Sequence, residues 1–496
     1  MKLYDLEFKR IFSTSNRRKY RLPVGEMSFL NDFIGDKRSD LYPVLNSSGD
    51  IIESVKDGRY TVSSDNGGSV TRLIGAFFPY YTYSLRVCEL SSARVGISLN
   101  HSKYKLLISF SSTDASIEFM GRVILKQECD IKKGDVVSVT FRAGGISIYR
   151  LRDEIESLIG DYCDNANDSA IKDLSENGLY ALLSEKIYKE APAALTLSLG
   201  KKSLVKLSEV SVYLSGGIGQ ADLRPMKYEN GEVVTEGGRV FLTASERLET
   251  GAYQSILSWL PTTSDIRMEG ALFFDLGDGV ASNDVATTAV YDRDTNQWYI
   301  WFCAFSHGHA LARAKTTADI RYGISVIDAL PLPKLPDDDK FNLGAVFGDE
   351  DPDLIKCGEK WHLAVCRYEP DGYHYYRFTS NDPLDNFTLA DRTPGKEKTG
   401  GSFVNFEGDI YFVCGSDFKR RAVYDVYELC DFSSPRPLKH DFDDGGFRGW
   451  GSVFGIDIGT RRRYFHLTFD RFLTSKKWNW SYGNVYLFEA DEYFKI

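Results

Sequence analysis

Short apolar runs bounded by turn residues recur through the second half of the chain. The clearest example spans 350–367, EDPDLIKCGEKWHLAVCR, in which acidic residues lead into Leu354 and Ile355, a glycine turn and the apolar run Trp361–Cys366. Runs of this length between turn signals predict buried strands, so this stretch predicts an acid-tipped strand followed by its hairpin partner. The same pattern begins near four other residues: Asp222, Asp284, Gly400 and Trp450.

These five stretches follow one another at intervals of about 45–67 residues, and most contain two further strand-like runs. Repeats of this period with about four strands each are typical of β-propellers. We therefore predict an all-β fold in which residues 216–496 form a five-bladed β-propeller. The alternative is an array of β-sandwiches whose spacing is coincidental.

The first part of the chain, residues 1–215, has a different pattern. Strand-like runs follow one another mostly at about ten-residue intervals up to residue 142, and one more covers 204–214. Regular short strands separated by turns predict a β-sandwich, and their order resembles that of lectin-like jelly-roll (concanavalin-like) sandwiches. Apolar residues at three- and four-residue steps predict a helical insertion at about 150–192. We expect a structural accessory domain, with sugar binding as the alternative.

Composition and charge narrow the class of protein. Of 496 residues 43% are hydrophobic, and 29 Tyr and 31 Phe favour strands, because aromatic side chains fit a pleated, half-buried surface. The formal net charge of −10 argues against nucleic-acid binding, which needs a basic surface. No run approaches the ~18 apolar residues of a membrane span, so no membrane partner is expected. The eight cysteines show no CxxC spacing, and we expect no disulfide framework.

The N-terminal residues lack the apolar core of a signal peptide. We therefore expect a cytoplasmic protein if Met1 is the native start, and a secreted or periplasmic protein if a signal has been removed. The oligomeric state is left open.

Acidic residues mark the strand starts of the first three repeats. In a propeller, the innermost strand of each blade starts at one face of the disc, and the loop after the second strand returns to that face. This geometry gathers five candidate catalytic acids around one axial pocket: Asp222, Asp284, Glu350, Asp351 and Asp353. Charged groups are almost never fully buried unless paired. Glycoside hydrolysis explains converging acids, because it needs one protonated and one ionised carboxyl group beside the scissile bond.

A second set of residues on the same strand starts and loops, and near the C-terminus, is predicted to bind substrate: Arg224, Arg247, His307, His309, Arg313, Arg367, Asp417, Arg448, Trp450, His466 and Arg471. Guanidinium groups read carboxylates with a two-point fork, so the arginines favour an acidic sugar. The alternative is that they neutralise the acids in pairs, which leaves a neutral furanose open. The His-x-His pair is compatible with a metal, but such loop pairs are more often solvated or in contact with substrate. We expect no metal and no cofactor.

The repeats resemble the five-bladed β-propeller glycoside hydrolases, the superfamily that contains families 32, 43, 68 and 117. Residues 351–363, DPDLIKCGEKWHL, are similar to the D-P-x-x-hydrophobic-x-x-G blade opening of that group, and 399–417, TGGSFVNFEGDIYFVCGSD, resemble its GGS-type blade. The resemblance covers about 280 residues.

The resemblance implies a nucleophile or base, a transition-state stabiliser and a general acid on three successive blades. Asp222 matches the first of these acids. Asp284 matches the second imperfectly, because the usual proline is absent and Asp284 is further from its strand. Asp351 or Asp353 matches the third, where the superfamily more often has glutamate and Glu350 is the nearest one.

The sequence therefore predicts an exo-acting glycoside hydrolase that cleaves a terminal furanose or acidic sugar from an oligosaccharide or polysaccharide. The alternatives are a non-catalytic carbohydrate-binding propeller and a propeller glycoside phosphorylase, whose phosphate site the arginines would form. Sugar release without phosphate distinguishes the hydrolase from both.

Overall fold

The computed structural model describes residues 1–14, 20–25, 43–164, 178–261, 263, 265–281, 284–308, 310–333, 335–336, 348–416, 423–441, 449–469 and 485–490. The chain divides into two compact units. The larger one contains Met1–Arg21 and Gly216–Ile496, and the smaller one contains Leu22–Ala166 and Asp173–Ser215.

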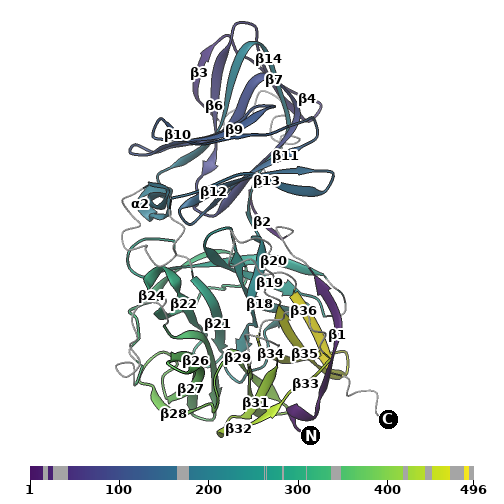
Figure 1. Cartoon of the computed structure of the whole chain (residues 1–496), viewed down its shortest axis with the longest axis vertical. Coiled ribbons are helices and arrows are strands. Elements are labelled where there is room, and N and C mark those ends of the chain that lie inside the picture. Colours follow the sequence, from purple (N-terminus) through teal and green to yellow (C-terminus); the bar gives the residue numbers. More distant parts are fainter. Residues whose placement is uncertain are drawn as a thin grey trace. The chain divides into compact units, whose positions relative to one another are not determined.

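The larger unit is a five-bladed β-propeller (Figure 1). Blade 1 consists of β15 (Gly219–Pro225), β18 (Arg239–Arg247), β19 (Ala252–Trp259) and β20 (Ile266–Asp275). Blade 2 consists of β21 (Asp284–Asp292), β22 (Gln297–Ala304), β23 (Ala310–Thr316) and β24 (Gly323–Leu330). Blade 3 consists of β25 (Glu350–Cys357), β26 (Lys360–Glu369), β27 (Gly372–Ser380) and β28 (Thr388–Arg392). Blade 4 consists of β29 (Thr399–Phe406), β30 (Asp409–Gly415), β31 (Tyr424–Glu428) and β32 (Asp431–Pro437).

Blade 5 combines both ends of the chain. It consists of β34 (Ser452–Ile458), β35 (Arg461–Phe469), β36 (Val485–Ala490) and β1 (Glu7–Thr14). The inner strands β15, β21, β25, β29 and β34 contact one another in this order around the ring, and β34 returns to β15. Blades 1 and 2 are also joined at their outer edges, where β20 and β24 pair in parallel. Three two-residue strands complete the unit: β16 (Lys227–Tyr228), β17 (Thr235–Glu236) and β33 (Lys439–His440).

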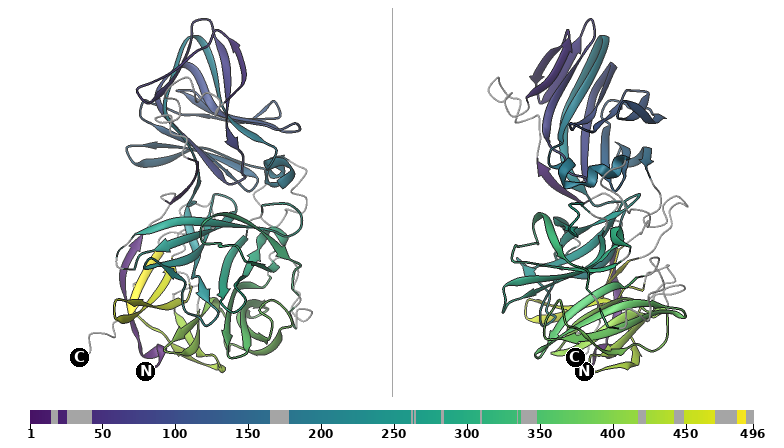
Figure 2. Two further views of the ribbon diagram at one scale, coloured as in Figure 1. Left: turned by 180° about the vertical axis from the view of Figure 1, so that it is seen from behind. Right: turned by 90° about the vertical axis from the view of Figure 1, so that its left-hand side faces the viewer.

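The N-terminal strand corrects the predicted boundary of 1–215 for the sandwich. Strand β1 pairs antiparallel with β36, from Phe8 opposite Ala490 to Thr14 opposite Val485, and lies beside it in Figures 1 and 2. The buried side chains of Leu3, Leu6 and Phe8 join an apolar cluster built from blades 4 and 5. The sequence of a single strand does not show which strand it pairs with. In the fold, β1 supplies the hydrogen-bonding partner for the edge of β36.

Truncation of Phe8 measures how much this closing strand stabilises the ring. Phe8 is 0% exposed, whereas Ile11 of the same strand is 45% exposed. We expect Phe8→Ala to lower the free energy of unfolding by about 3–5 kcal/mol, because it leaves a cavity, and Ile11→Ala to change it by less than about 0.5 kcal/mol. Denaturant unfolding tests this, and equal small losses in both variants would contradict β1 as the closing strand.

The smaller unit is a β-sandwich whose two sheets share the long strands β7 (Tyr81–Asn100) and β14 (Pro192–Ser215). One sheet adds β3 (Val44–Gly49), β6 (Gly68–Ala76), β8 (Lys105–Phe110), β9 (Asp114–Phe119) and β10 (Arg122–Glu128). The other adds β4 (Ile52–Lys56), β5 (Arg59–Ser64), β11 (Val136–Arg142), β12 (Gly145–Arg152) and β13 (Ile155–Cys163), and β2 (Arg21–Gly25) also pairs with β14. Buried apolar residues of both sheets, such as Leu85, Val95 and Val139, form the core.

The predicted helical insertion at about 150–192 is helical only in its last part. Residues 155–163 form strand β13, and the helices are η4 (Gly178–Leu183) and α2 (Glu185–Tyr188). The pairing of β13 with β12 outweighs the helical spacing of the apolar residues. Pairing with the edge of a sheet provides hydrogen-bond partners for the backbone N–H and C=O groups along the segment. The other described helices are η1 (Leu3–Asp5) and η5 (Phe305–His307), and no helix in the described ranges is long and apolar enough to span a membrane.

A buried histidine in blade 5, His466, makes stability depend on pH. His466 Nδ1 lies 2.6 Å from His440 Nε2, and burial lowers the pKa of His466 to about 4. An unfolded histidine has a pKa of about 6.5. As the pH falls below about 6.5, the unfolded state binds a proton that the folded state refuses until about pH 4. Stability is therefore lost across this window.

We expect His466 alone to cost on the order of 3 kcal/mol between pH 7 and pH 4. The free energy of unfolding measured across this range should fall less steeply in His466→Asn than in the unsubstituted protein. Identical slopes would contradict a neutral His466 in the fold.

Candidate active site

The inner strands of four blades share one backbone feature at the same face of the propeller. In β15, β21, β25 and β29 the pairing with the second strand shifts register near the strand start, which marks a β-bulge. One residue of each bulge has a positive φ: Asp222 (54°), Ala286 (54°), Asp351 (49°) and Gly400 (61°). We call this residue the bulge position. Bulges re-aim side chains and are common beside active sites.

The residue types at the bulge position fit its conformation in three blades of the four. Glycine adopts positive φ without strain, and aspartate is the kind of short polar residue that tolerates the left-handed region. The aspartates of blades 1 and 3 thus hold equivalent positions. Blade 2 has alanine instead, so the sequence-based match of Asp284 to the second acid is displaced by two residues.

Asp351 is the bulge-position acid of blade 3 and is buried. Its Oδ2 accepts hydrogen bonds from the Thr399 hydroxyl and the Gly400 amide, both at 3.1 Å. Burial, reinforced by the charges of Glu350 and Asp222, raises the pKa of Asp351 to about 6. Asp351 therefore retains its proton in a substantial fraction of molecules in mildly acidic solution. We call Asp222, Glu350 and Asp351 the mouth acids.

Asp222 is held by a cation. Arg247 Nη2 donates to Asp222 Oδ2 at 2.9 Å, and the Asp222 side chain is only 10% exposed. The Arg247 guanidinium lies 5.8 Å from the ring centre of Phe305, in the β22–β23 connection. His307, two residues further, lies 3.2 Å from the Asp278 carboxylate. Asp222 is therefore ion-paired, whereas Asp351 accepts hydrogen bonds from Thr399 and Gly400, so the two bulge-position aspartates differ in environment.

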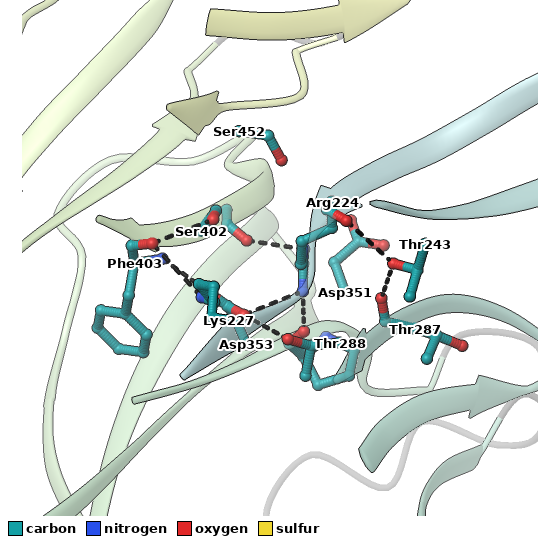
Figure 3. Close-up of polar contacts among 12 residues, drawn as sticks. Arg224, Lys227, Thr243, Thr287, Thr288, Asp351, Asp353, Ser402, Phe403 and Ser452 are labelled. Atoms are coloured by element: carbon teal, nitrogen blue, oxygen red, sulfur yellow. Dashed lines mark hydrogen bonds and ion pairs between the residues drawn. The ribbon is translucent and has the colours of Figure 1, made fainter. Parts of the chain in front are cut away.

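Two residues beyond Asp351 on β25, Asp353 belongs to a buried polar cluster that ties the inner strands of the blades together. Lys227 Nζ donates to Asp353 Oδ2 at 2.6 Å, and the Thr288 hydroxyl donates to Asp353 Oδ1 at 2.6 Å. Arg224 lies 3.6 Å from Asp353 and donates to the Gly401 carbonyl at 2.8 Å. Figure 3 shows these side chains converging from different blades. We call Arg224, Lys227, Thr288 and Asp353 the axial cluster.

The axial cluster corrects two predictions. Arg224 and Asp353 were expected to bind or cleave substrate, but both side chains are 0% exposed. Both Asp353 oxygens accept hydrogen bonds, one of them also from the Phe403 amide at 2.6 Å. These contacts lower the pKa of Asp353, despite its burial. Asp353 therefore neutralises two buried cations and has no path to a ligand.

Four further residues predicted to bind substrate are engaged inside the fold. Arg367 pairs with Asp349 at 2.9 Å, and Arg313 pairs with Asp385 at 2.5 Å. Trp450 is buried and its indole donates to the Leu223 carbonyl at 2.5 Å, and His466 accompanies His440 within blade 5. The alternative in which arginines neutralise acids in pairs therefore describes Arg224, Arg247, Arg313 and Arg367. These arginines therefore do not support an acidic sugar as the substrate.

The remaining predicted residues divide into two groups. Asp284 is buried at the start of β21, and its carbonyl accepts a hydrogen bond from Gln254 Nε2 at 2.8 Å. It stands two residues before the bulge position, as Asp349 does in blade 3. Four others lie outside the described residues: His309, Asp417, Arg448 and Arg471.

Sequence reasoning missed several residues that shape the site: Lys227, Phe305, Thr399 and the amide of Gly400. A signal for the last was present, because glycine at a strand start permits the left-handed bulge. Nothing in the sequence indicated Lys227, whose partner Asp353 is 126 residues away.

No protein-family model and no curated protein matches the chain. Among solved structures, it is similar to the catalytic domain of a GH62 α-L-arabinofuranosidase from Coprinopsis cinerea, with 12% identity, coverage of 54% of this chain and 92% of that one, and a TM-score of 0.38. It is also similar to an exo-β-1,3-galactanase from Clostridium thermocellum, with 9% identity, coverage of 53% of this chain and 62% of that one, and a TM-score of 0.39. A third similar structure is a family 117 glycoside hydrolase from Zobellia galactanivorans, with 10% identity, coverage of 55% of this chain and 84% of that one, and a TM-score of 0.40.

Proposed function

We propose that the chain is a glycoside hydrolase in which Asp351 is the general acid and Asp222 its ionised partner. The observation that carries the proposal is the pair of aspartates at equivalent bulge positions of blades 1 and 3. One has a pKa raised to about 6 by burial, and the other is ion-paired to Arg247. Two carboxyl groups of opposite protonation state are what glycosidic bond cleavage requires.

In the proposed reaction, Asp351 donates its proton to the glycosidic oxygen as the bond from that oxygen to the anomeric carbon breaks. Asp222 acts on the opposite side of the sugar, either by attacking the anomeric carbon or by removing a proton from the attacking water. If Asp222 attacks, the Asp351 carboxylate then removes a proton from the water that displaces Asp222 from the anomeric carbon, and Asp351 is protonated again. If Asp222 instead takes the proton of the attacking water, it passes that proton to solvent, and Asp351 regains one from solvent before the next turnover. Thr399 and the Gly400 amide hold its Oδ2, so its other oxygen is the one offered to substrate.

We further propose exo-action on a terminal sugar. The axial cluster joins blades 1, 2 and 3 through buried side chains, which supports an axis closed to a threading sugar chain. A site closed at its far end favours a chain end over an internal residue. Blade 2 has Ala286 at its bulge position, so only two acids stand at bulge positions rather than three. If a third carboxylate stabilises the transition state, Asp284 or Glu350 supplies it.

A second candidate is a non-catalytic carbohydrate-binding propeller. Ala286 favours it, because blade 2 then has no acid at its bulge position. The phosphorylase loses its main support, because Arg224, Arg247, Arg313 and Arg367 are each paired with a carboxylate.

Sugar release from a panel of plant and microbial oligosaccharides, with and without phosphate, separates these candidates. The hydrolase predicts release that is independent of phosphate, and release of single sugars from chain ends if it is exo-acting. Phosphate-dependent release would identify a phosphorylase. Binding without release from any member of the panel would support the carbohydrate-binding propeller.

A further inference from the structure

Blade 3 contains a second polar site apart from the mouth acids. A pocket of about 560 Å³ lies between the β26–β27 hairpin, the segment after β28 and the outer strand of blade 4. This volume is within the range of about 300–1,000 Å³ typical of small-molecule sites. The polar residues that line it are Asp371, His374, Arg392, Thr393, Lys396 and Ser433.

The pocket opens at the end of blade 3 that carries the mouth acids. The β26–β27 hairpin turns between Glu369 and Gly372, and β26 pairs with the start of β25, where Glu350 lies opposite Cys366. The hairpin is therefore displaced outward from Asp351 along the same blade. A polymer with one end at the axis has this surface within reach.

Arg392 is positioned to bind an oxyanion. Its Nη1 donates to both oxygens of Glu369, at 2.8 and 2.9 Å, which fixes the guanidinium plane. Its Nε and Nη2 make no hydrogen bond to any residue that the structure describes, and the side chain is 53% exposed. Lys396 is exposed, and its charge acts on the Asp371 carboxylate of the same pocket. A held guanidinium with two donors left on one edge matches a carboxylate or sulfate.

The β26–β27 hairpin and the start of β27 provide a carboxylate, held by a histidine, that is suited to sugar hydroxyls. His374, whose side chain is 5% exposed, lies with Nε2 3.0 Å from Asp371 Oδ1. Within the described part of the chain its Nδ1 has no hydrogen-bond partner. Asp371 itself is exposed and retains acceptor capacity. The pocket thus combines two cations with a carboxylate and a buried imidazole.

A divalent cation is a weaker candidate for this pocket. Glu369, Asp371 and His374 could each offer one ligand atom, all within 4.8 Å of one another. However, Glu369 already accepts from Arg392 and from the Tyr376 hydroxyl. A metal ion bound there would lie beside a guanidinium, and like charges at this range repel.

We propose that this pocket binds an anionic sugar residue, carrying a carboxylate or a sulfate ester, as a site separate from the catalytic acids. The proposal rests on the proposed function only in taking a carbohydrate polymer as the ligand. The anionic group contacts Arg392 and Lys396, and the sugar hydroxyls contact Asp371, whose carboxylate His374 positions.

Titration calorimetry on the Asp351→Asn variant tests this without turnover. The probes are trigalacturonate, galactose 6-sulfate, neutral galactotriose, inorganic sulfate and Zn²⁺. We expect at least one anionic sugar to bind at least tenfold more tightly than the neutral one. Comparing trigalacturonate with galactose 6-sulfate shows whether the pocket prefers a carboxylate or a sulfate. Lys396→Ala should weaken this binding about fivefold, and Arg392→Lys, which keeps the charge beside Glu369 but loses the fork, about tenfold. Lys315→Ala, an exposed lysine of blade 2, is the matched control and should change nothing.

Equal binding of neutral and anionic sugars, unchanged affinity in both variants, or binding of inorganic sulfate or Zn²⁺ alone would overturn the proposal. Failure of the proposed function is distinguishable, because this binding is measured on a variant without the general acid. A protein that hydrolyses sugars but shows none of this binding refutes the pocket alone.

Discussion

Replacing Asp351 by asparagine is expected to lower the rate of sugar release by a factor of about 10³ while leaving the fold intact. General acids typically contribute 10²–10⁴-fold to a rate. Asparagine preserves the shape of the side chain, and its carbonyl oxygen still accepts from Thr399 and Gly400. Asp222→Asn should cost a similar factor, because the neutral amide neither attacks nor removes a proton. Initial rates on the best substrate of the panel measure both effects.

Asp409→Asn is the control for this experiment, since its carboxylate is 66% exposed at the start of β30, far along its blade from the bulge position. It should retain full activity, and thermal unfolding of all three variants should confirm that they are folded. Activity within threefold of the unsubstituted protein in both Asp351→Asn and Asp222→Asn would refute the assignment of the site.

Replacing Asp353 by alanine is expected to destabilise the propeller by about 3–5 kcal/mol, which is the typical cost of removing one partner of a buried ion pair. The change leaves Lys227 and Arg224 buried without their carboxylate, and it removes the acceptor of the Thr288 hydroxyl. Burial already lowers the pKa of Lys227, so we expect loss of Asp353 to lower that pKa further. Urea unfolding measures the change in free energy.

Thr288→Val removes only one neutral donor to Asp353 and should cost about 1 kcal/mol. Asp409→Ala, at an exposed position, should have little effect. A loss below about 1 kcal/mol for Asp353→Ala would contradict the view that the axial cluster holds the blades together.

The propeller was predictable from sequence because each blade repeats the same local pattern of apolar runs and turns. The closure of the ring was not, because it depends on the pairing of β1 with β36, separated by most of the chain. A strand pattern specifies a face to bury but not the partner, and partners distant in sequence leave no local trace. The strand over 155–163 shows the same limit, because its apolar spacing fits a helix while its pairing with β12 decides the structure.

The candidate site was predictable only in part. The acid-tipped inner strands indicated Asp222 and Asp351, but sequence could not tell Asp351 from Asp353, two residues apart in one motif. The bulge separates them, since it gives Asp351 a different backbone conformation and leaves Asp353 in the axial cluster. The arginines were misassigned for a similar reason, because their carboxylate partners lie on other strands or loops. Charge alone does not show whether a guanidinium faces a ligand or an internal acid.

The most direct test of the central claim compares two substrates on the same variants. A glycoside with an activated aryl leaving group needs little protonation, whereas the natural glycosidic oxygen needs a general acid. If Asp351 is the general acid, Asp351→Asn should lose about 10³-fold on the natural substrate but less than about tenfold on the activated one. Asp222→Asn should be slow on both. Equal losses of Asp351→Asn on the two substrates would contradict the role of Asp351 as the proton donor.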